Sequence, residues 1–343
     1  MARVAINGFG RIGRTFFRSS YGHPDIEIVA INDLGSLENL AYLLTYDSVY
    51  GRSPFSVEVK DNALFVDGKK IEFLQERDPE KLPWKDSNVD IVVESTGFFT
   101  TYAGAKKHLT AGAKRVVVSA PVKDEPESAG VTGATILMGV NDDKLATCDI
   151  TSNASCTTNA TSPLIAILKE AIGIEKAILN TVHAYTATQS LIDGPSKGDV
   201  RKGRAAALNI IPSSTGAAQA TTKAHTELAG KFDGVAMRVP VPVGSLVDVT
   251  FIASKNTTVE EVNDALKKAA TNPKWKNIYT ATDEPLVSSD IIGSQVGSIA
   301  DLSFTRVVDG NLVKVFAWYD NETSYTQTLV EHVAAAARFI EKK

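Results

Sequence analysis

Residues 4–13 carry the sequence VAINGFGRIG, a short apolar run followed by three glycines in the pattern GxGxxG. The pattern alone is weak, because glycines near an N-terminus also occur in ordinary turns. Here the apolar run is typical of a buried strand, and residues 12–19 are typical of a helix. In such a unit Gly8 allows a tight turn, Gly10 lets the backbone approach a pyrophosphate, and Gly13 lets the helix pack on the sheet. The stretch therefore predicts a dinucleotide site at a helix N-terminus.

An acidic residue stands where the second strand of such a unit ends. Residues 27–31 are strand-like, and Asp33 lies 20 positions after Gly13, close to the spacing that the dinucleotide fold requires. A carboxylate there accepts hydrogen bonds from the adenosine ribose and repels the extra phosphate of NADP. The sequence therefore favours NAD, with the alternative that Asp33 is only a turn residue between Asn32 and Gly35.

The first part of the chain alternates strand and helix patterns, which predicts a parallel sheet covered by helices. Further strands are expected at 90–93 and 115–118, with a helix at 102–109 between them. Residues 62–73 have the pattern of an inserted hairpin, because Asp67 and Gly68 form a two-residue turn between strand-like segments.

The pattern changes after residue 150. A helix is expected first, and then a mixed, largely antiparallel sheet with strands at 177–182, 235–239, 246–253, 299–308 and 312–318. The last helix, expected at 325–340, has no strand after it. The length of 343 residues favours two domains. We therefore expect an α/β protein with a Rossmann-type dinucleotide-binding domain, 1–155 plus the C-terminal helix 322–343, and an α+β catalytic domain, 156–321.

One of the two cysteines lies between an expected strand and an expected helix. Cys156, in the run SNASCTTN (152–159), falls at the helix N-terminus, where the helix dipole and the backbone N–H groups lower the pKa of a thiol. This placement favours a nucleophile. Cys148 enters a strand and is better explained as a small buried side chain.

A thiolate nucleophile works with a nearby base. His183 follows the strand expected at 177–182, and catalytic groups collect where strands end in loops. From the residues alone, a general base and a structural histidine are equal alternatives. His108, His225 and His332 are expected within helices and fit the role of base less well.

Two segments are suited to anions. Residues 213–216 (SSTG) open a predicted helix, so their hydroxyl and N–H groups are able to hold a phosphate. Arg238 lies in an apolar strand, where its guanidinium needs an anionic partner. That partner is either a carboxylate, which is the more frequent case, or a substrate phosphate. The loop 193–204 has no apolar period, and loops of that length are usually functional or mobile, with a solvated loop as the alternative.

Composition excludes several classes of protein. The net charge of −4 gives no electrostatic reason to expect nucleic acid or an anionic membrane as a partner. No signal-peptide pattern precedes the first strand, and no apolar run has the length of a membrane span. Two cysteines make no disulfide framework, and no cysteine–histidine spacing suggests a metal site. A reducing, cytoplasmic setting is expected.

Several segments in the same order make the chain resemble the phosphorylating glyceraldehyde-3-phosphate dehydrogenase family over nearly its whole length. SNASCTTN is the most specific of them, and the others are INGFGRIGR (6–14), INDL (31–34), ERDP (76–79), ESTG (94–97), HAYT (183–186), NIIPSSTGAA (209–218), MRVP (237–240) and WYDNET (318–323).

The resemblance implies a role for each matching residue. Cys156 would be the nucleophile and His183 its base. Inorganic phosphate would contact Ser155, Thr157, Thr215 and Gly216, and the substrate phosphate would contact Thr186 and Arg238. Besides the glycines Gly8, Gly10 and Gly13, the NAD contacts would be Arg11, Ile12, Asp33, Arg77, Thr96, Ser119 and Asn321, the last at the nicotinamide.

The resemblance also implies a reaction of glycolysis and gluconeogenesis. Glyceraldehyde 3-phosphate would be oxidised by NAD through a Cys156 thioester, and inorganic phosphate would release 1,3-bisphosphoglycerate. The family is usually a homotetramer, with the loop 193–204 at a subunit interface near a neighbour's cofactor. We expect a homo-oligomer of this kind, with neither nucleic acid nor membrane as a partner and with no metal.

The sequence departs from the common family pattern near the expected phosphate and nicotinamide sites. Ala160 replaces a second cysteine, which removes a disulfide partner for the nucleophile. The other departures are Gln219 for lysine, Val241, Val243 and Gly244 for Thr, Asn and Val, and Ser324 for glycine. These changes bear on affinity and substrate preference rather than on the chemistry.

Three rival functions share parts of this pattern. Erythrose-4-phosphate dehydrogenase uses the same chemistry, but that relative departs at Thr186 and at the STG segment. Semialdehyde dehydrogenases, which reduce acyl phosphates, do not combine SNASCTTN with HAYT at this spacing. A non-catalytic NAD-binding protein on the same fold is the alternative from a different class, and the presence of both Cys156 and His183 argues against it.

Overall fold

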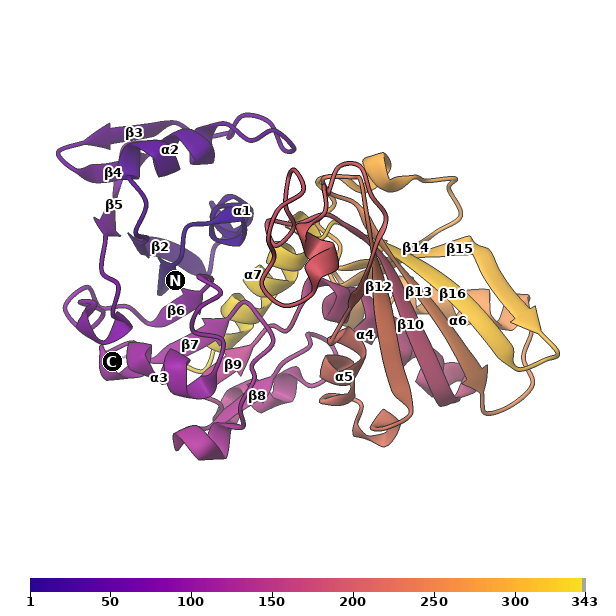
Figure 1. Ribbon diagram of the computed structural model, residues 1–343. Helices are drawn as coiled ribbons and strands as arrows, with labels where there is room; N and C mark the ends of the chain where they lie inside the picture. The colour runs from indigo at the N-terminus through magenta and orange to yellow at the C-terminus, as the bar shows by residue number, and fades with distance from the viewer. Residues whose placement is uncertain (341–343) are drawn as a thin grey trace. The chain divides into compact units, whose positions relative to one another are not determined.

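The computed structural model describes residues 1–340 and divides into two compact units (Figure 1). The first unit comprises Met1–Ala154 and the segment from Leu329 onward, and the second comprises Ser155–Thr328. The first limit expected from the sequence, 155/156, lies one residue from the division at 154/155, whereas the second, 321/322, lies seven residues before the division at 328/329. The last three residues of the expected segment 322–343 lie outside the described part.

A nine-stranded sheet with the order β3-β4-β5-β2-β1-β6-β7-β9-β8 forms the centre of the first unit. The strands from β5 to β8 in this order are parallel, as predicted, whereas β3, β4 and β5 pair antiparallel. Their bounds are β1 (Ala2–Asn7), β2 (Ile26–Asn32), β3 (Val57–Lys60), β4 (Ala63–Val66), β5 (Lys69–Leu74), β6 (Ile91–Glu94), β7 (Arg115–Val118), β8 (Gly133–Thr135) and β9 (Ile150–Ser152).

The central strand β1 has β2 on one side and β6 on the other, so the order of the chain reverses there. In open parallel sheets the carboxyl ends of strands at such a reversal form the crevice that holds ligands. Strands β1, β2 and β6 end at Asn7, Asn32 and Glu94, and the cofactor site is therefore expected beside these three residues.

Apolar residues fill both faces of this sheet, because neighbouring side chains of a strand point to opposite faces. In β1, Val4 and Ile6 join one hydrophobic cluster and Ala5 joins another. The helices of this unit are α1 (Arg11–Ser20), α2 (Leu37–Thr45) and α3 (Tyr102–Thr110), with short 3-10 helices at Pro79–Lys81, Pro126–Ala129 and Asp142–Thr147. The helix predicted at 12–19, after the GxGxxG segment, is confirmed as α1, which is one residue longer at each end.

The predicted hairpin is confirmed at β4 and β5, where Val66 pairs with Lys69 across a two-residue turn. Asp67 and Gly68 have φ values of 47° and 76°, the left-handed conformation of a type I′ turn. Asp67 tolerates this conformation better than most residues do, and its carboxylate accepts hydrogen bonds from the backbone N–H and the hydroxyl of Ser56.

The last helix, α7 (Thr323–Ala337), contributes to the core of the first unit from Leu329 onward. Leu329, Val330 and Val333 are fully buried and belong to the same cluster as Phe16 of α1. The C-terminal part of the chain thus returns to the sheet that its first residues build.

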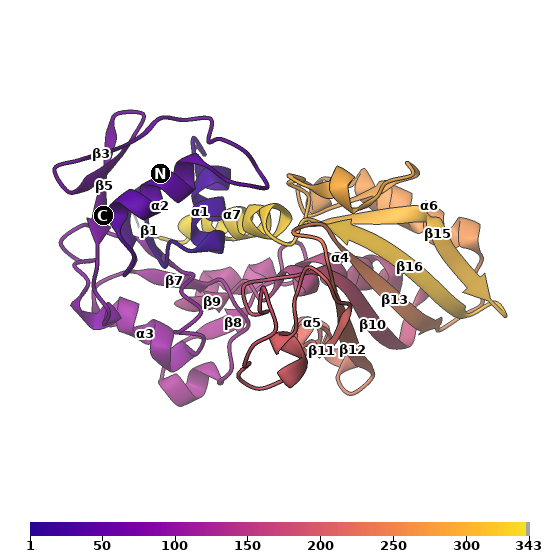
Figure 2. The same cartoon turned by 45° about the horizontal axis from the view of Figure 1, so that its top comes forward.

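A seven-stranded mixed sheet with the order β11-β12-β10-β13-β16-β15-β14 forms the second unit (Figure 2). The pairs β10–β12 and β14–β15 are parallel and the others are antiparallel, as the sequence predicted for most of this sheet. Its strands are β10 (Ile174–Ala184), β11 (Ile211–Ser214), β12 (Phe232–Val239), β13 (Ser245–Ala253), β14 (Tyr279–Thr282), β15 (Ser298–Val308) and β16 (Leu312–Tyr319).

Two helices, α4 (Cys156–Ile172) and α6 (Val259–Ala270), pack against each other and against this sheet (Figure 2). Thr258 caps α6 by accepting from the backbone N–H of Glu261, and the Glu261 carboxylate accepts from the hydroxyl of Thr257. The shorter helices are α5 (Ala217–Thr222) and the 3-10 helices Val200–Gly203, Thr226–Leu228, Pro273–Trp275 and Ser288–Ile291.

Two local predictions were wrong. His183 lies within β10, which continues to Ala184. His225 lies outside any α-helix, because α5 ends at Thr222 and His225 precedes the 3-10 helix Thr226–Leu228. No helix among residues 1–340 has the length and apolar character needed to cross a membrane.

The return of α7 to the first unit predicts a large effect of a single truncation there. Leu329→Ala should lower the free energy of unfolding by about 2–5 kcal/mol, because it leaves a cavity in a fully buried cluster. Leu34→Ala is the matched control, since Leu34 is 54% exposed and its truncation should cost less than about 0.5 kcal/mol. Urea denaturation of the cofactor-free protein measures both, and equal effects would contradict this packing.

Candidate active site

A tight turn places Cys156 at the start of α4. The hydroxyl of Ser152, the last residue of β9, accepts from the backbone N–H of Ala154 at 3.0 Å. Ala154 has φ 53°, a left-handed conformation that turns the chain sharply. The side chain of Ser155 then caps α4 by accepting from the backbone N–H of Thr158, which makes Cys156 the first residue of the helix. The predicted position of Cys156 at a helix N-terminus is thus confirmed.

The pairing of β10 with β12 sets two functional side chains side by side. His183 and Arg238 are register partners in this parallel pair, and Arg238 Nη1 lies 2.5 Å from His183 Nδ1. The other ring nitrogen, Nε2, lies 3.4 Å from Cys156 Sγ. Three residues from α4, β10 and β12 therefore meet at one place, although they are far apart in the sequence.

Two tautomers of His183 are compatible with its neighbours. The carbonyl oxygen of Ala184 lies 2.7 Å from His183 Nδ1 and 3.0 Å from Arg238 Nη1, so it accepts from both groups when Nδ1 carries the ring proton, whereas Nδ1 accepts from Arg238 Nη1 when the proton is on Nε2. In the first tautomer the lone pair of Nε2 faces the thiol of Cys156. A neutral imidazole with this orientation is the form that accepts a proton from a nucleophile.

Burial and the charge of Arg238 both disfavour the imidazolium. Together they lower the pKa of His183 to about 3, with burial the larger cause. Removal of the sulfur from water raises the pKa of the Cys156 thiol, and the Arg238 guanidinium opposes this rise. The helix N-terminus led us to predict a lowered thiol pKa, and this prediction was wrong for the free protein because desolvation is the larger effect. The resting pair is a neutral thiol beside a neutral imidazole.

Arg238 has no carboxylate partner among residues 1–340. Its Nη1 donates to the carbonyl of Ala184 and, in the tautomer with the ring proton on Nε2, also to His183 Nδ1, and its Nε is buried without an acceptor within the described chain. The structural salt bridge that the sequence offered as an alternative is therefore not found. A buried guanidinium with an unused donor is suited to an anionic ligand.

The other predicted anion-binding residues lie at the starts of the helices α4 and α5 and just after the strand β10. Ser155 and Thr157 begin α4, and the hydroxyl of Thr157 is bonded to the hydroxyl of Tyr319 at 2.9 Å. Thr215 accepts from the backbone N–H of Ala217 at the start of α5, where Gly216 is the N-cap residue. Thr186 follows β10 and its hydroxyl is bonded to that of Thr188. Ser155 and Thr157 flank Cys156 in the chain, and none of these groups hydrogen-bonds His183 within residues 1–340.

Two further residues support the site and were missed by the sequence analysis. Tyr319 is fully buried, its hydroxyl also bonds Thr181, and its ring meets the ring of His183 edge-on with centroids 5.9 Å apart. Ser245 donates to Asn321 Oδ1 at 3.0 Å and accepts from the backbone N–H of Ala184. A buried tyrosine and a buried serine require polar partners, but the sequence does not show which partners they find.

A cavity of about 510 Å³ lies where β1, β2 and β6 end in the first unit. Of the predicted cofactor contacts, Gly8, Gly10, Asp33, Arg77 and Thr96 line it. The remaining lining residues are Asn7, Asn32, Leu34, Glu76, Ser95, Phe98 and Phe99, which the sequence analysis did not assign. The polar residues at the strand ends could have been found from the rule that ligands lie at the carboxyl ends of parallel strands.

The three glycines have separate reasons to be glycine. A Cβ on Gly13 would lie 2.1 Å from the carbonyl oxygen of Gly8, and one on Gly8 would lie 2.6 Å from the backbone nitrogen of Thr96. Gly8 also has φ 94°. A Cβ on Gly10 would meet no protein atom within 4 Å, although Gly10 lines the cavity. The protein itself therefore needs Gly8 and Gly13, whereas the absence of a side chain at Gly10 leaves room for a ligand against the N-terminus of α1, which no side chain caps.

The acidic residue Asp33 combines a structural and a ligand-facing position. Its carboxylate accepts from the backbone N–H groups of Phe9 at 2.7 Å and Gly35 at 2.8 Å, and the residue lines the cavity. A turn role and a ribose role are thus compatible. Leu34 and Phe98, 54% and 87% exposed, offer apolar surface at the same cavity for a flat heteroaromatic ring. These features fit a dinucleotide.

Five predicted cofactor residues do not line this cavity. The Arg11 guanidinium is paired with Asp47 and lies over the ring of Tyr50, so its side chain is held by contacts within the protein. Ile12 and Gly13 lie in the first turn of α1, and Ser119 follows β7. Asn321 belongs to the second unit. No group of three or more potential metal ligands occurs among residues 1–340.

Comparisons with known proteins decide the family. The model of the glyceraldehyde 3-phosphate dehydrogenase NAD binding domain matches residues 2–102, and that of the C-terminal domain matches residues 155–321. The glyceraldehyde-3-phosphate dehydrogenase of Geobacillus stearothermophilus is 51% identical over 98% of both chains. The chain belongs to the glyceraldehyde-3-phosphate dehydrogenase family. The enzyme of that name from Clostridium acetobutylicum is 48% identical over 98% of this chain and 99% of the relative, and glyceraldehyde-3-phosphate dehydrogenase 1 of Bacillus subtilis is 49% identical over 98% of each.

Membership of the glyceraldehyde-3-phosphate dehydrogenase family confirms the resemblance that the sequence motifs suggested. The predicted α/β class, with a dinucleotide-binding domain and a mixed-sheet domain, is confirmed with it. The matching NAD binding domain also supports NAD as the cofactor. The roles of the individual residues stay proposals, which the geometry above supports to different degrees.

The contact between Arg238 and His183 predicts a titration effect. Arg238→Met removes a positive charge that disfavours the imidazolium, so the pKa of His183 should rise from about 3 towards its ordinary value of 6.5. Nuclear magnetic resonance of the ring protons, assigned by loss of the signal in His183→Asn, measures the shift. Arg306→Met is the control, because Arg306 bonds only backbone carbonyls of its own strand. A His183 titration that is the same in Arg238→Met and in the unchanged protein would contradict the contact.

Proposed function

We propose that this protein oxidises D-glyceraldehyde 3-phosphate to 1,3-bisphosphoglycerate with NAD and inorganic phosphate, the reaction of glycolysis and gluconeogenesis. The observation that carries the proposal is the 3.4 Å contact between Cys156 Sγ and His183 Nε2 at the N-terminus of α4. It occurs in a chain whose relatives of about 50% identity bear the name of this activity.

The first step uses the neutral pair found in the structure. As the thiol of Cys156 attacks the aldehyde carbon, its proton passes to His183 Nε2 and a thiohemiacetal forms on the sulfur. The developing oxyanion is stabilised by the protonated His183 and by backbone N–H groups at the start of α4, where the helix dipole favours negative charge. A thiolate therefore need not persist in the free enzyme, because its proton leaves as the carbon–sulfur bond forms.

The second step oxidises this adduct. Bound NAD supplies a hydride acceptor for the thiohemiacetal carbon. His183 first returns the thiol proton to the oxyanion, which gives the hydroxyl of the thiohemiacetal, and then accepts that proton again as the hydride leaves, so the carbon becomes a thioester carbonyl on Cys156. Asn321 is held in one orientation by Ser245, which bonds its Oδ1 and leaves the side-chain nitrogen as a donor for the nicotinamide carboxamide.

The final step and the substrate each need an anion site. We assign the substrate's phosphate to Arg238 and Thr186, because Arg238 Nε is buried without an acceptor among residues 1–340. Inorganic phosphate, which attacks the thioester and restores the Cys156 sulfur, is assigned to Ser155, Thr157, Thr215 and Gly216 at the starts of α4 and α5.

The Arg238 position links substrate binding to the base. In the free protein the guanidinium lowers the pKa of His183. A substrate phosphate on Arg238 offsets this positive charge, so it raises the pKa of His183 and makes the imidazole a stronger base while the substrate is bound. The enzyme would thus be most reactive when the aldehyde is in place.

The assembly and the location are also proposals. Leu191, Ile192, Val200, Leu208 and Ile210 are each at least 69% exposed, and apolar surface of this kind in the segment 191–210 is typical of a protein interface. We infer a homo-oligomer, for which the family predicts a tetramer; sedimentation of a single monomeric species at micromolar concentration would contradict it. A reducing compartment, the cytoplasm, suits an enzyme whose two cysteines are free and whose nucleophile must remain a thiol.

The reaction itself is tested by the formation of reduced nicotinamide with glyceraldehyde 3-phosphate. Steady turnover should require NAD and inorganic phosphate together, and NADP should be a poorer cofactor because of Asp33. Cys156→Ala should lower kcat at least about a thousandfold, and His183→Asn should lower it by about 10²–10⁴. Cys148→Ala is the matched control, since Cys148 is a free, buried thiol outside the site, and it should retain full activity.

The rival functions give different results in the same assay. Turnover that is faster with erythrose 4-phosphate would favour the related dehydrogenase. Turnover at the same rate with and without inorganic phosphate would contradict the second anion site. It would indicate that the sequence departures at Val241, Val243 and Gly244 matter for phosphate use. No turnover, in a protein that still binds NAD, would favour a non-catalytic NAD-binding protein.

A further inference from the structure

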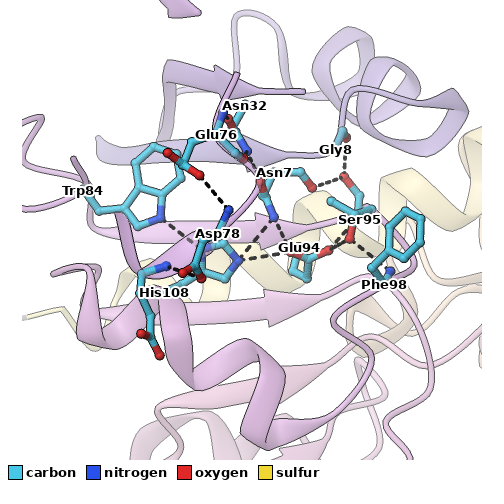
Figure 3. A network of polar contacts seen from close by, with 12 residues as sticks. Asn7, Gly8, Asn32, Glu76, Asp78, Trp84, Glu94, Ser95, Phe98 and His108 are labelled. Atoms are coloured by element: carbon cyan, nitrogen blue, oxygen red, sulfur yellow. Dashed lines mark hydrogen bonds and ion pairs between the residues drawn. The ribbon is translucent and has the colours of Figure 1, made fainter. Parts of the chain in front are cut away.

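A chain of buried side chains lies beneath the proposed cofactor cavity and is not used in the chemistry (Figure 3). It connects the ends of β1, β2 and β6 to α3 and to the loop before β6. Its members Asn7, Asn32, Trp84, Glu94 and His108 are each at most 5% exposed. Because groups so deeply buried must be hydrogen-bonded within the protein, the direction of each hydrogen bond can be worked out from its neighbours.

One end of the chain is fixed by backbone. The N–H of Glu76 donates to Asn32 Oδ1 at 2.8 Å, and Asn32 Nδ2 donates to the carbonyl of Glu76 at 2.9 Å. The amide of Asn32 therefore has one allowed orientation. Its Nδ2 also donates to Asn7 Oδ1 at 2.7 Å, which turns the Nδ2 of Asn7 towards Glu94 Oε2 at 2.5 Å.

The other end is fixed by an indole. Trp84 Nε1 is only a donor, and it lies 3.0 Å from His108 Nδ1, so that nitrogen must be the acceptor. The ring proton of His108 is then on Nε2, which lies 3.0 Å from the same oxygen, Glu94 Oε2. Glu94 Oε2 thus receives donors from Asn7 and from His108, as Figure 3 shows.

The second oxygen of Glu94 is surrounded in the same way. Glu94 Oε1 accepts from the backbone N–H of Thr96 at 2.8 Å and from the hydroxyl of Thr96. Every hydrogen-bonding neighbour of this carboxylate is therefore a donor. An ionised carboxylate satisfies four donors, whereas an amide or a protonated acid would direct a hydrogen at one of them.

We propose that Glu94 is a positioning residue for the dinucleotide, acting through Thr96 and Asn7. Both of these residues line the cavity. The backbone nitrogen of Thr96 lies 2.6 Å from the place where a Cβ on Gly8 would be, so a shift of Thr96 moves it against the glycine turn or away from it. Ser95 completes the connection by donating to the carbonyl of Gly8 at 2.7 Å. The carboxylate thereby fixes the positions of Thr96 and Asn7, which line the cavity. This inference rests on the proposed use of NAD.

This arrangement makes Glu94→Gln a disruptive change despite its equal size. If the amide oxygen of the glutamine faces Thr96, its nitrogen meets the donors Asn7 and His108; if it is reversed, the nitrogen meets the backbone N–H of Thr96. Each orientation leaves buried donors without acceptors. Because Thr96 and Asn7 line the cavity, the loss should appear as weaker cofactor binding.

Calorimetric titration of NAD into the complete protein tests the proposal. Glu94→Gln should weaken NAD binding about tenfold to a hundredfold and raise the KM for NAD, while kcat at saturating NAD and the KM for the aldehyde stay within about twofold. Asp90→Asn is the matched control, because Asp90 stands at the other end of β6 and bonds Arg3 and Lys114. It should bind NAD as the unchanged protein does. Equal NAD affinity in Glu94→Gln would overturn the proposal.

If the unchanged protein fails to bind NAD, the proposed function fails, and that result is distinct from a failure of this inference. A second experiment covers the case in which Glu94→Gln does not fold well. Asn7→Asp places two carboxylates in contact, but combined with Glu94→Gln it moves the acceptor to position 7, where it faces both the glutamine nitrogen and His108 Nε2, which lies 3.4 Å from Asn7 Nδ2. Urea denaturation should find the double variant more stable than either single variant. Additive losses of stability would contradict the donor directions assigned to this network.

Discussion

The proposed chemistry depends on the 3.4 Å contact between Cys156 Sγ and His183 Nε2 in the second unit. It requires the helix α4 to begin at residue 156, which the left-handed Ala154 and the cap residue Ser155 bring about. It also requires β10 to extend to Ala184 and to pair with β12 in a register that sets His183 beside Arg238. A slip of one residue in that register would turn Arg238 to the other face of the sheet.

The electrostatics of this contact oppose the charged form that the reaction uses. Burial raises the pKa of the Cys156 thiol and lowers that of His183, and Arg238 acts on the two in directions that favour a thiolate but not an imidazolium. The free protein therefore holds the pair neutral. The charge of a bound substrate phosphate then changes the balance in favour of the base.

Most elements that the sequence predicted lie within a few residues of the observed ones, whereas α2, β11 and β14 were not predicted. Gly8, Gly13 and the turn at 67–68 can be explained from nearby residues. Gly8 and the turn have positive φ values, and a Cβ on Gly13 would meet the carbonyl oxygen of Gly8. The position of Cys156 followed from the strand before it and the helix after it. Family motifs, rather than periodicity, supplied the roles of the phosphate-binding residues.

What the sequence did not predict depends on contacts between residues far apart in the chain. The direction of the Cys156 pKa depends on how deeply the folded site removes the sulfur from water, which no local pattern shows. Arg11 was expected at the cofactor, but its side chain is bound to Asp47, 36 residues later. The supporting roles of Tyr319, Ser245 and Glu94 likewise appear only when strands distant in sequence lie side by side.

The proposed reaction depends on a thioester that forms on Cys156. The most direct measurement is mass spectrometry of the intact protein and its peptides after mixing with glyceraldehyde 3-phosphate and NAD in the absence of inorganic phosphate. We expect a phosphoglyceroyl adduct on the peptide that contains Cys156, formed together with about one reduced nicotinamide per site and released when phosphate is added. Reduced nicotinamide formed without an adduct, or an adduct on any other residue, would contradict it.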